Sequence, residues 1–116
     1  MFTGSHVILY SAAADEDRDF LRDRLGFASV DAGHGWLIFK LPPAEVAVHP
    51  TDGHPHHELY LMCDDIEQTL ARLSEAGVTI SAPITDLRWG RLAEIGLPSG
   101  TRLGVYEPRH PVAHSL

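Results

Sequence analysis

The chain has 116 residues, of which 44% are hydrophobic and 22% charged, a composition typical of one globular domain. Its formal net charge of −7 argues against nucleic acid as a partner, because nucleic-acid binding requires a basic surface. The sequence has no apolar run near the ~20 residues of a membrane span and residues 1–6 show no signal-peptide pattern, so we expect a cytoplasmic protein that does not bind membranes.

The first half is predicted to form a strand, a helix and three further strands. The first strand covers residues 6–10. In the following helix, acidic residues gather near the start and Arg22 and Arg24 near the end, as the helix dipole favours, and Gly26 stops it. The charged residues between Asp15 and Asp23 are expected to form a solvated helix face.

Residues 51–56 are rich in Pro, Gly and His, and they are predicted to be a linker without regular structure. The second half repeats the pattern of the first, beginning with a strand at residues 58–62. Asp65 is a predicted N-cap with Gln68 completing a capping box, and Gly77 suits the end of the helix.

The two halves are therefore similar in order and spacing, which indicates an internal duplication. We expect a single domain over residues 1–116. It would consist of a first βαβββ module (residues 5–50), the linker (51–56), a second βαβββ module (57–108) and a loose tail (109–116).

Side chains alternate between the two faces of a strand, so each predicted strand can be divided into two sets. One set is aliphatic and should pack under the helices. The other mixes imidazole, carboxylate and phenol groups with small or apolar residues, which is typical of a ligand cavity. An ordinary second core with hydrogen-bonded Tyr and His side chains is the alternative. The mixed set contains His6, Ile8, Tyr10, Ala47, His49, Glu58, Tyr60, Met62, Gly104 and Tyr106.

The paired βαβββ order, the Leu25-Gly26-Phe27 segment and the ending at residues 97–108 resemble the vicinal-oxygen-chelate superfamily. This is the glyoxalase, bleomycin-resistance and extradiol-dioxygenase group. The resemblance covers about residues 5–108. It implies an α+β fold in which two tandem βαβββ modules form an open, cup-shaped mixed sheet. It also implies a small-molecule substrate or ligand in the cup and a homodimer.

Metal-dependent members of this superfamily bind a divalent ion with side chains from the first and last strands of each module. The resemblance places these four positions at His6, Ala47, Glu58 and Gly104. Alanine and glycine side chains carry no donor atom, so two of the four expected ligands are absent.

The leading hypothesis is an enzyme with a different metal site, in which His6, His49 and Glu58 form a two-histidine, one-carboxylate set. Iron, zinc, nickel or manganese would then act as a Lewis acid on a substrate with neighbouring oxygens. Tyr106 or Tyr60 would serve as the proton donor. The enzyme would be a lyase or isomerase, or a ring-cleaving dioxygenase.

The alternative is a metal-free binding protein that resembles the antibiotic-sequestering members of the superfamily. Ala47 and Gly104 would make room for the ligand, and Glu58 and His49 would orient a polar group. The walls would be Tyr60, Tyr106, Met62 and Trp89. A third hypothesis is an interaction module whose only function is its dimer contact.

Two further features carry weaker functional hypotheses. The histidines of the linker region, His54, His56 and His57, suit adventitious nickel or zinc binding, and a solvated linker is the simpler interpretation. Cys63 is the single cysteine, which excludes an internal disulfide, and it alternates with leucines as a buried small hydrophobe would.

Overall fold

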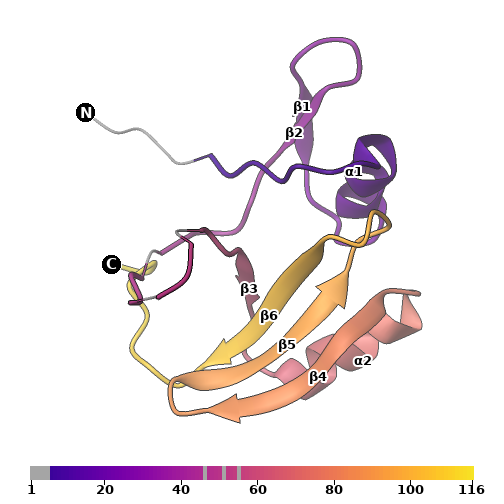
Figure 1. Cartoon of the computed structure of the whole chain (residues 1–116). Helices are drawn as coiled ribbons and strands as arrows, with labels where there is room; N and C mark the ends of the chain where they lie inside the picture. Colours follow the sequence, from indigo (N-terminus) through magenta and orange to yellow (C-terminus); the bar gives the residue numbers. More distant parts are fainter. Residues whose placement is uncertain (1–5, 46, 51, 55) are drawn as a thin grey trace.

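The computed structural model describes residues 6–45, 47–50, 52–54 and 56–116 (Figure 1). Within them, the chain forms a four-stranded sheet, a two-stranded hairpin and two helices, which confirms the predicted α+β class. In chain order the elements are α1 (Ala14–Asp23), β1 (Ser29–Asp31), β2 (Leu37–Phe39), β3 (Tyr60–Met62), α2 (Ile66–Glu75), β4 (Thr79–Leu87), β5 (Gly90–Gly96) and β6 (Arg102–Pro108).

The four-stranded sheet has the strand order β3-β6-β5-β4. β3 runs parallel to β6, with Tyr60 opposite Gly104 and Met62 opposite Tyr106. The pairs β5–β6 and β4–β5 are antiparallel. The second half thus has the predicted order of strand, helix and three strands, and α2 lies along one side of the sheet (Figure 1).

α2 begins and ends where the sequence predicts. The Asp65 side chain accepts a hydrogen bond of 3.0 Å from the Gln68 backbone N–H, which satisfies one of the free donors of the first turn. Gly77 has φ +85°, the left-handed conformation that favours glycine after a last turn. Ile66 and Leu70 are buried and lie on the helix face that covers the sheet.

One hydrophobic core lies between the sheet and the helices. On β6, Leu103 and Val105 are 1% and 2% exposed, which confirms that the aliphatic set of the second half packs under the helices. The buried members of this core are Phe20, Ile66, Leu70, Val78, Ala93, Ile95, Leu97, Leu103 and Val105.

α1 joins this core from the first half of the chain. Its Phe20 is part of the core, and its Asp17 accepts hydrogen bonds from the backbone N–H (3.1 Å) and the Oγ (2.7 Å) of Ser99 in the β5–β6 turn. Asp17 is only 6% exposed, so the prediction of a fully solvated charged face is wrong at this position. Sequence spacing does not reveal that a distant turn covers one of the acidic residues.

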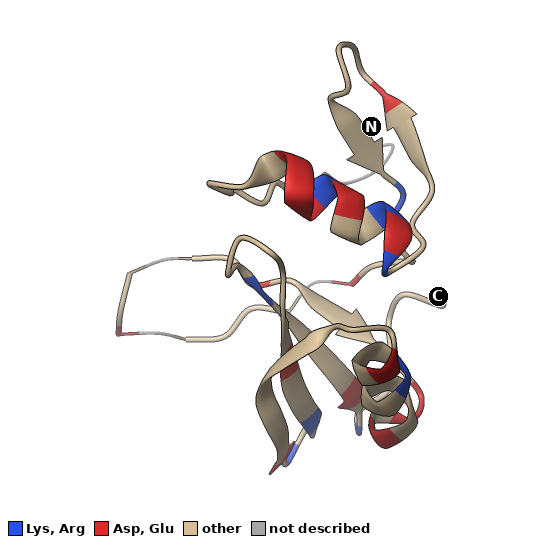
Figure 2. Cartoon of the chain, turned by 90° about the vertical axis from the view of Figure 1, so that its right-hand side faces the viewer, with Lys and Arg blue, Asp and Glu red and all other residues tan. Residues whose placement is uncertain are grey.

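The rest of the acidic residues on α1 are exposed, as predicted. Figure 2 shows blue and red segments alternating along the helix. Asp15 and Asp19 form ion pairs of 2.9 and 3.2 Å with Arg18 and Arg22, each three residues away. Among the described residues, neither helix has the length and apolar character needed to span a membrane.

The first half differs most from the expectation. Residues 6–10 and 47–50 form no strand, although strands were predicted there, and Val46 lies outside the described residues. The β1–β2 hairpin and the segment before α1 extend away from the four-stranded sheet (Figures 1 and 2). Alternating apolar residues favour a strand only where a neighbouring strand supplies backbone partners. The described part of the chain supplies none to these two segments.

Candidate functional site

An aromatic cluster covers the sheet face opposite α2. The ring centroids of Tyr60 and Tyr106 are 5.7 Å apart, and those of Trp89 and Tyr106 are 5.5 Å apart, both with edge-to-face geometry. His49 makes an edge contact with Trp89 at 6.4 Å, and the ring of His110 lies 6.0 Å from that of Tyr106. We call these five residues the aromatic cluster.

Strand alternation places the cluster on this face. Tyr60 and Tyr106 alternate with Leu61 and Val105, which point into the core on the α2 side. Trp89 lies in the short turn between β4 and β5, beside the end of β6. The sheet therefore presents its aliphatic side chains to the helices and its aromatic side chains to the other side.

Gly104 is the position where the Tyr60 ring approaches the backbone of β6. A Cβ built on Gly104 would overlap the ring atoms of Tyr60. The space that glycine leaves is thus filled by the protein's own tyrosine. We expected Gly104 to leave room for a ligand. In the structure the Tyr60 ring fills that room, so it is the Tyr60 ring that faces the site.

The Tyr60 hydroxyl donates a short hydrogen bond to the Glu58 carboxylate, which also lies 3.3 Å from the Nε2 of His56. Burial, followed by the Glu58 carboxylate, raises the pKa of Tyr60 to about 12. The hydrogen bond from Tyr60 in turn lowers the pKa of Glu58. Both effects keep the tyrosine protonated and the glutamate charged at neutral pH.

The second tyrosine has its own partner. The Tyr106 hydroxyl lies 2.9 Å from the Nε2 of His110, whose Nδ1 is 2.8 Å from the Pro111 carbonyl oxygen. Because a carbonyl only accepts, Nδ1 carries the proton in this arrangement and Nε2 accepts from the tyrosine. Burial, together with the negative charge of Glu45, raises the pKa of Tyr106.

The structure brings together five of the residues that the sequence singled out, but not all of them. Glu58, Tyr60, Trp89, Tyr106 and His49 meet on the aromatic face; His49 is near enough for its charge to contribute to the lowered pKa of Glu58, after the hydrogen bonds. Met62, also on β3, is half-buried and lines a cavity beside α2, away from the aromatic cluster. The remaining predicted ligand residues of the first half, His6, Ile8, Tyr10 and Ala47, are exposed.

Sequence reasoning missed three polar residues of this face. Glu94 lies directly opposite Gly104 on β5, with a carboxylate 3.6 Å from Arg102, and its charge contributes to the raised pKa of Tyr60. A carboxylate alternating with Ala93 and Ile95 in an apolar strand was a signal that could have revealed it. Glu45 and His110 lie in segments without periodicity, so no pattern could place them.

The four positions that the superfamily resemblance implies for metal ligands do not supply a complete set of donors. Ala47 and Gly104 have no donor atoms, and the Tyr60 ring occupies the side-chain space at Gly104. Across the residues that the structure describes, no three His, Cys, Asp or Glu side chains approach closely enough to hold an ion. The set of His6, His49 and Glu58 is therefore not assembled, and we derive no metal-dependent step.

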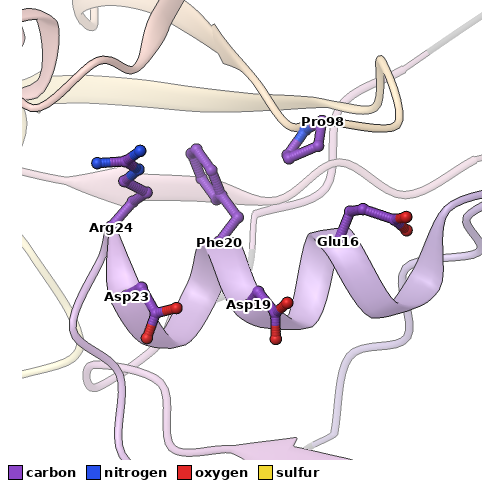
Figure 3. Close-up of a pocket in the computed structure, with 6 residues that line it drawn as sticks. All are labelled: Glu16, Asp19, Phe20, Asp23, Arg24 and Pro98. Atoms are coloured by element: carbon purple, nitrogen blue, oxygen red, sulfur yellow. The ribbon is translucent and has the colours of Figure 1, made fainter.

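Two cavities lie away from the aromatic cluster. One, of about 310 Å³, lies between α1 and the β5–β6 turn, and its lining includes Glu16, Phe20, Arg24 and Pro98 (Figure 3). The other, of about 220 Å³, lies on the α2 side of the sheet and includes Cys63 and Val105 in its lining.

Comparison with known proteins gives one family. Residues 5–109 match the model of the Glyoxalase/Bleomycin resistance protein/Dioxygenase superfamily. No curated protein sequence matches the chain significantly.

Solved structures of the same fold cover nearly the whole chain. TnmS3, an antibiotic binding protein from Streptomyces sp. CB03234, is 28% identical over 93% of this chain and 99% of its own, with a TM-score of 0.63. A lactoylglutathione lyase from Agrobacterium tumefaciens is 18% identical over 90% and 92%, with a TM-score of 0.64. A superfamily member from Sphaerobacter thermophilus DSM 20745 is 22% identical over 91% and 98%, with a TM-score of 0.59.

Proposed function

We propose that this chain, which belongs to the Glyoxalase/Bleomycin resistance protein/Dioxygenase superfamily, is a metal-free binding protein for a planar aromatic molecule that carries a positive charge. The ligand would lie against the half-buried rings of Tyr60 and Trp89, which the buried ring of Tyr106 holds in place between them. The fold alone does not choose between binding and catalysis, so the proposal rests on the residues of the aromatic face.

The observation that carries the proposal is the continuous edge-to-face contact from Tyr60 through Tyr106 to Trp89. Such contacts hold the rings in fixed orientations before any ligand arrives, which reduces the entropy lost on binding. Trp89 and Tyr60 are only half-buried, so parts of both rings remain accessible to a ligand. Flat aromatic surfaces of this kind favour planar partners.

Charge favours a cation over an anion. Two carboxylates, Glu58 and Glu94, flank Tyr60, and the whole chain has a net charge of −7. A cation above an aromatic ring gains about 0.5–2 kcal/mol from the ring quadrupole. The lowered pKa of Glu58 keeps its negative charge in place at neutral pH.

TnmS3 supports the binding class. It is described as an antibiotic binding protein, and at 28% identity over nearly the full length it shares more than the fold with this chain. An antibiotic with a planar, positively charged ring system is thus a suitable ligand class. Tyr60 and Tyr106, first considered as proton donors, take the role of wall residues whose hydroxyls are already held by Glu58 and His110.

Fluorescence of Trp89 offers a direct test. The chain has two tryptophans, and Trp36 is 65% exposed on the hairpin side, so Trp36→Phe leaves Trp89 as the only tryptophan. We expect proflavine, a planar aromatic cation, to quench this signal saturably, and calorimetry to give the same Kd. Naphthalene-2-sulfonate, a planar anion, should bind at least about tenfold more weakly, a difference of about 1.4 kcal/mol.

Two variants distinguish the contribution of the aromatic rings to binding from that of the carboxylates. Tyr60→Leu removes a ring and should weaken proflavine binding, whereas Glu94→Gln should reduce the preference for the cation and keep the affinity for a neutral analogue. Equal binding of cation and anion would overturn the charge assignment. Unchanged proflavine affinity in Tyr60→Leu would overturn the site.

A further inference from the structure

We propose that a second ligand site lies on the other side of the sheet, in the cavity of about 220 Å³ beside α2, and that it binds a small apolar molecule with an anionic head group. The cavity is separate from the aromatic cluster, because none of the five cluster residues lines it. Its lining includes residues of α2, the core-facing Leu61 and Val105, and Met62 at the end of β3. Both halves of the chain contribute apolar lining residues, namely Leu25, Phe27, Pro42, Leu61, Met62, Leu73 and Val105.

The interior of this cavity is suited to an apolar body. Its polar lining groups already have partners: the Thr69 hydroxyl donates to the Asp65 carbonyl oxygen (2.8 Å), and the Cys63 thiol to that of Tyr106 (3.7 Å). A volume of 220 Å³ equals that of about seven waters in the liquid, at about 30 Å³ each. That is room for a short hydrocarbon chain with a polar head.

Arg24 makes the cavity favour ligands with a negatively charged head group. It is the one charged residue among the described residues that line the cavity. Its Nη1 donates to the Ala76 carbonyl oxygen (3.0 Å), and a guanidinium has further N–H donors in the same plane. Figure 3 shows Arg24 pointing from α1 toward the sheet, while Asp19 and Asp23 point away.

The ligand head group therefore meets a guanidinium, and its hydrocarbon chain meets leucine, phenylalanine and valine. A planar guanidinium binds carboxylates with two parallel hydrogen bonds, which makes a short monocarboxylate the simplest ligand of this chemistry.

Cys63 reports on occupancy without any added label, because it lines the cavity and is the only cysteine of the chain. The probe is sodium hexanoate, and the signal is the rate of Cys63 alkylation by iodoacetamide, followed by mass spectrometry. At a hexanoate concentration ten times its Kd we expect alkylation about tenfold slower, from mass action. Hexanol should protect less, and hexylamine least.

Variants of Arg24 test the head-group contact. Arg24→Gln should abolish the preference for hexanoate over hexanol, and Arg24→Lys should keep most of it. The matched control is Arg72→Gln, which removes an exposed arginine of α2 that does not line the cavity and should behave as wild type. Melting curves of all variants establish that they are folded.

Three results would overturn the proposal. One is the lack of saturable protection by hexanoate at any soluble concentration. Another is equal protection by hexanoate and hexylamine. The third is loss of hexanoate protection in Trp89→Phe, since that residue belongs to the other face and should leave this cavity unchanged.

Discussion

The ring of Tyr60 lies directly against the backbone of Gly104 on the neighbouring parallel strand, in space that any other residue would fill with its Cβ. The two residues are opposite each other in the register of β3 and β6. The position of the Tyr60 ring in the aromatic cluster therefore depends on Gly104, 44 residues later in the sequence, having no side chain.

Gly104→Ala should push the Tyr60 ring out of place. Overpacking of this kind costs typically about 1–3 kcal/mol of unfolding free energy, measured by urea denaturation. Gly96→Ala is the matched control, because the nearest atoms to a Cβ there are at 3.9 Å and ordinary contact results. In a Tyr60→Ala background the cost of Gly104→Ala should largely vanish, which gives a coupling energy above about 0.5 kcal/mol. If the changes in unfolding free energy caused by Gly104→Ala and Tyr60→Ala simply added, this would contradict the contact between the two residues.

Asp17→Ala should loosen α1 from the rest of the molecule. The substitution leaves the Ser99 backbone N–H without its acceptor, whereas the Ser99 hydroxyl keeps the Thr101 hydroxyl, 2.9 Å away. The loss of one acceptor from a buried donor costs about 1–3 kcal/mol in unfolding free energy. Asp15→Ala is the control, because Asp15 lies in the same helical turn but its side chain is 91% exposed. Its effect should stay within about 0.5 kcal/mol. Equal effects of the two substitutions would contradict the anchoring role of Asp17.

Stability should fall at high pH because of Tyr60. Its pKa is raised to about 12 in the folded chain, above the value of about 10 for an unfolded tyrosine, so the unfolded state loses its proton first. The contribution is fully present below about pH 10 and is lost as the pH rises toward about 12. Tyr60→Phe should flatten this part of the curve, followed by urea midpoints and tyrosinate absorbance. An unchanged curve would contradict the raised pKa of Tyr60, which burial and the Glu58 carboxylate cause.

Removal of divalent metal should leave stability unchanged. Two of the four positions that the superfamily resemblance implies for metal ligands carry Ala47 and Gly104, so we expect that a chelator does not shift the Tm of untagged protein. The histidines near the linker can bind nickel or zinc adventitiously, and His54→Gln with His57→Gln removes two of them. One ion per chain that persists in this double variant, found by elemental analysis, would contradict the metal-free proposal.

The exposed apolar residues of the first half lead us to expect a homodimer. Tyr10 and Val48 are 87% and 93% exposed, and Val7 and Ile8 are at least half exposed. Burial of such side chains against a second copy would remove apolar surface from water. Light scattering should give twice the chain mass, and Ile8→Asp should lower it, whereas His54→Asp in the linker should not. A monomer at all concentrations would contradict this prediction.

The second half of the fold could be predicted from the sequence because its signals are local. Asp65, the apolar stripe beginning at Ile66, and Gly77 define α2 within a few residues, and alternation in β6 separates Val105 from Tyr106. These properties depend on backbone conformation and nearest neighbours, which the residue types themselves control.

The candidate site could be predicted only in part because it depends on distances across the sheet. Alternation placed Tyr60 and Gly104 on one face, but the filling of the glycine space by the tyrosine follows from the register. The sequence also gave no signal for His110 as the partner of Tyr106, since it lies in a tail without periodicity. The same limit applies to residues 6–10, whose alternation favours a strand but does not identify its neighbour.

Val105 and Tyr106 are consecutive in the chain, yet one lines the cavity beside α2 and the other forms part of the aromatic cluster. A backbone displacement at this point would change the shape of both proposed ligand sites at once. Selection for a new specificity on one face would therefore alter the other, and the two preferences would be expected to evolve together rather than separately.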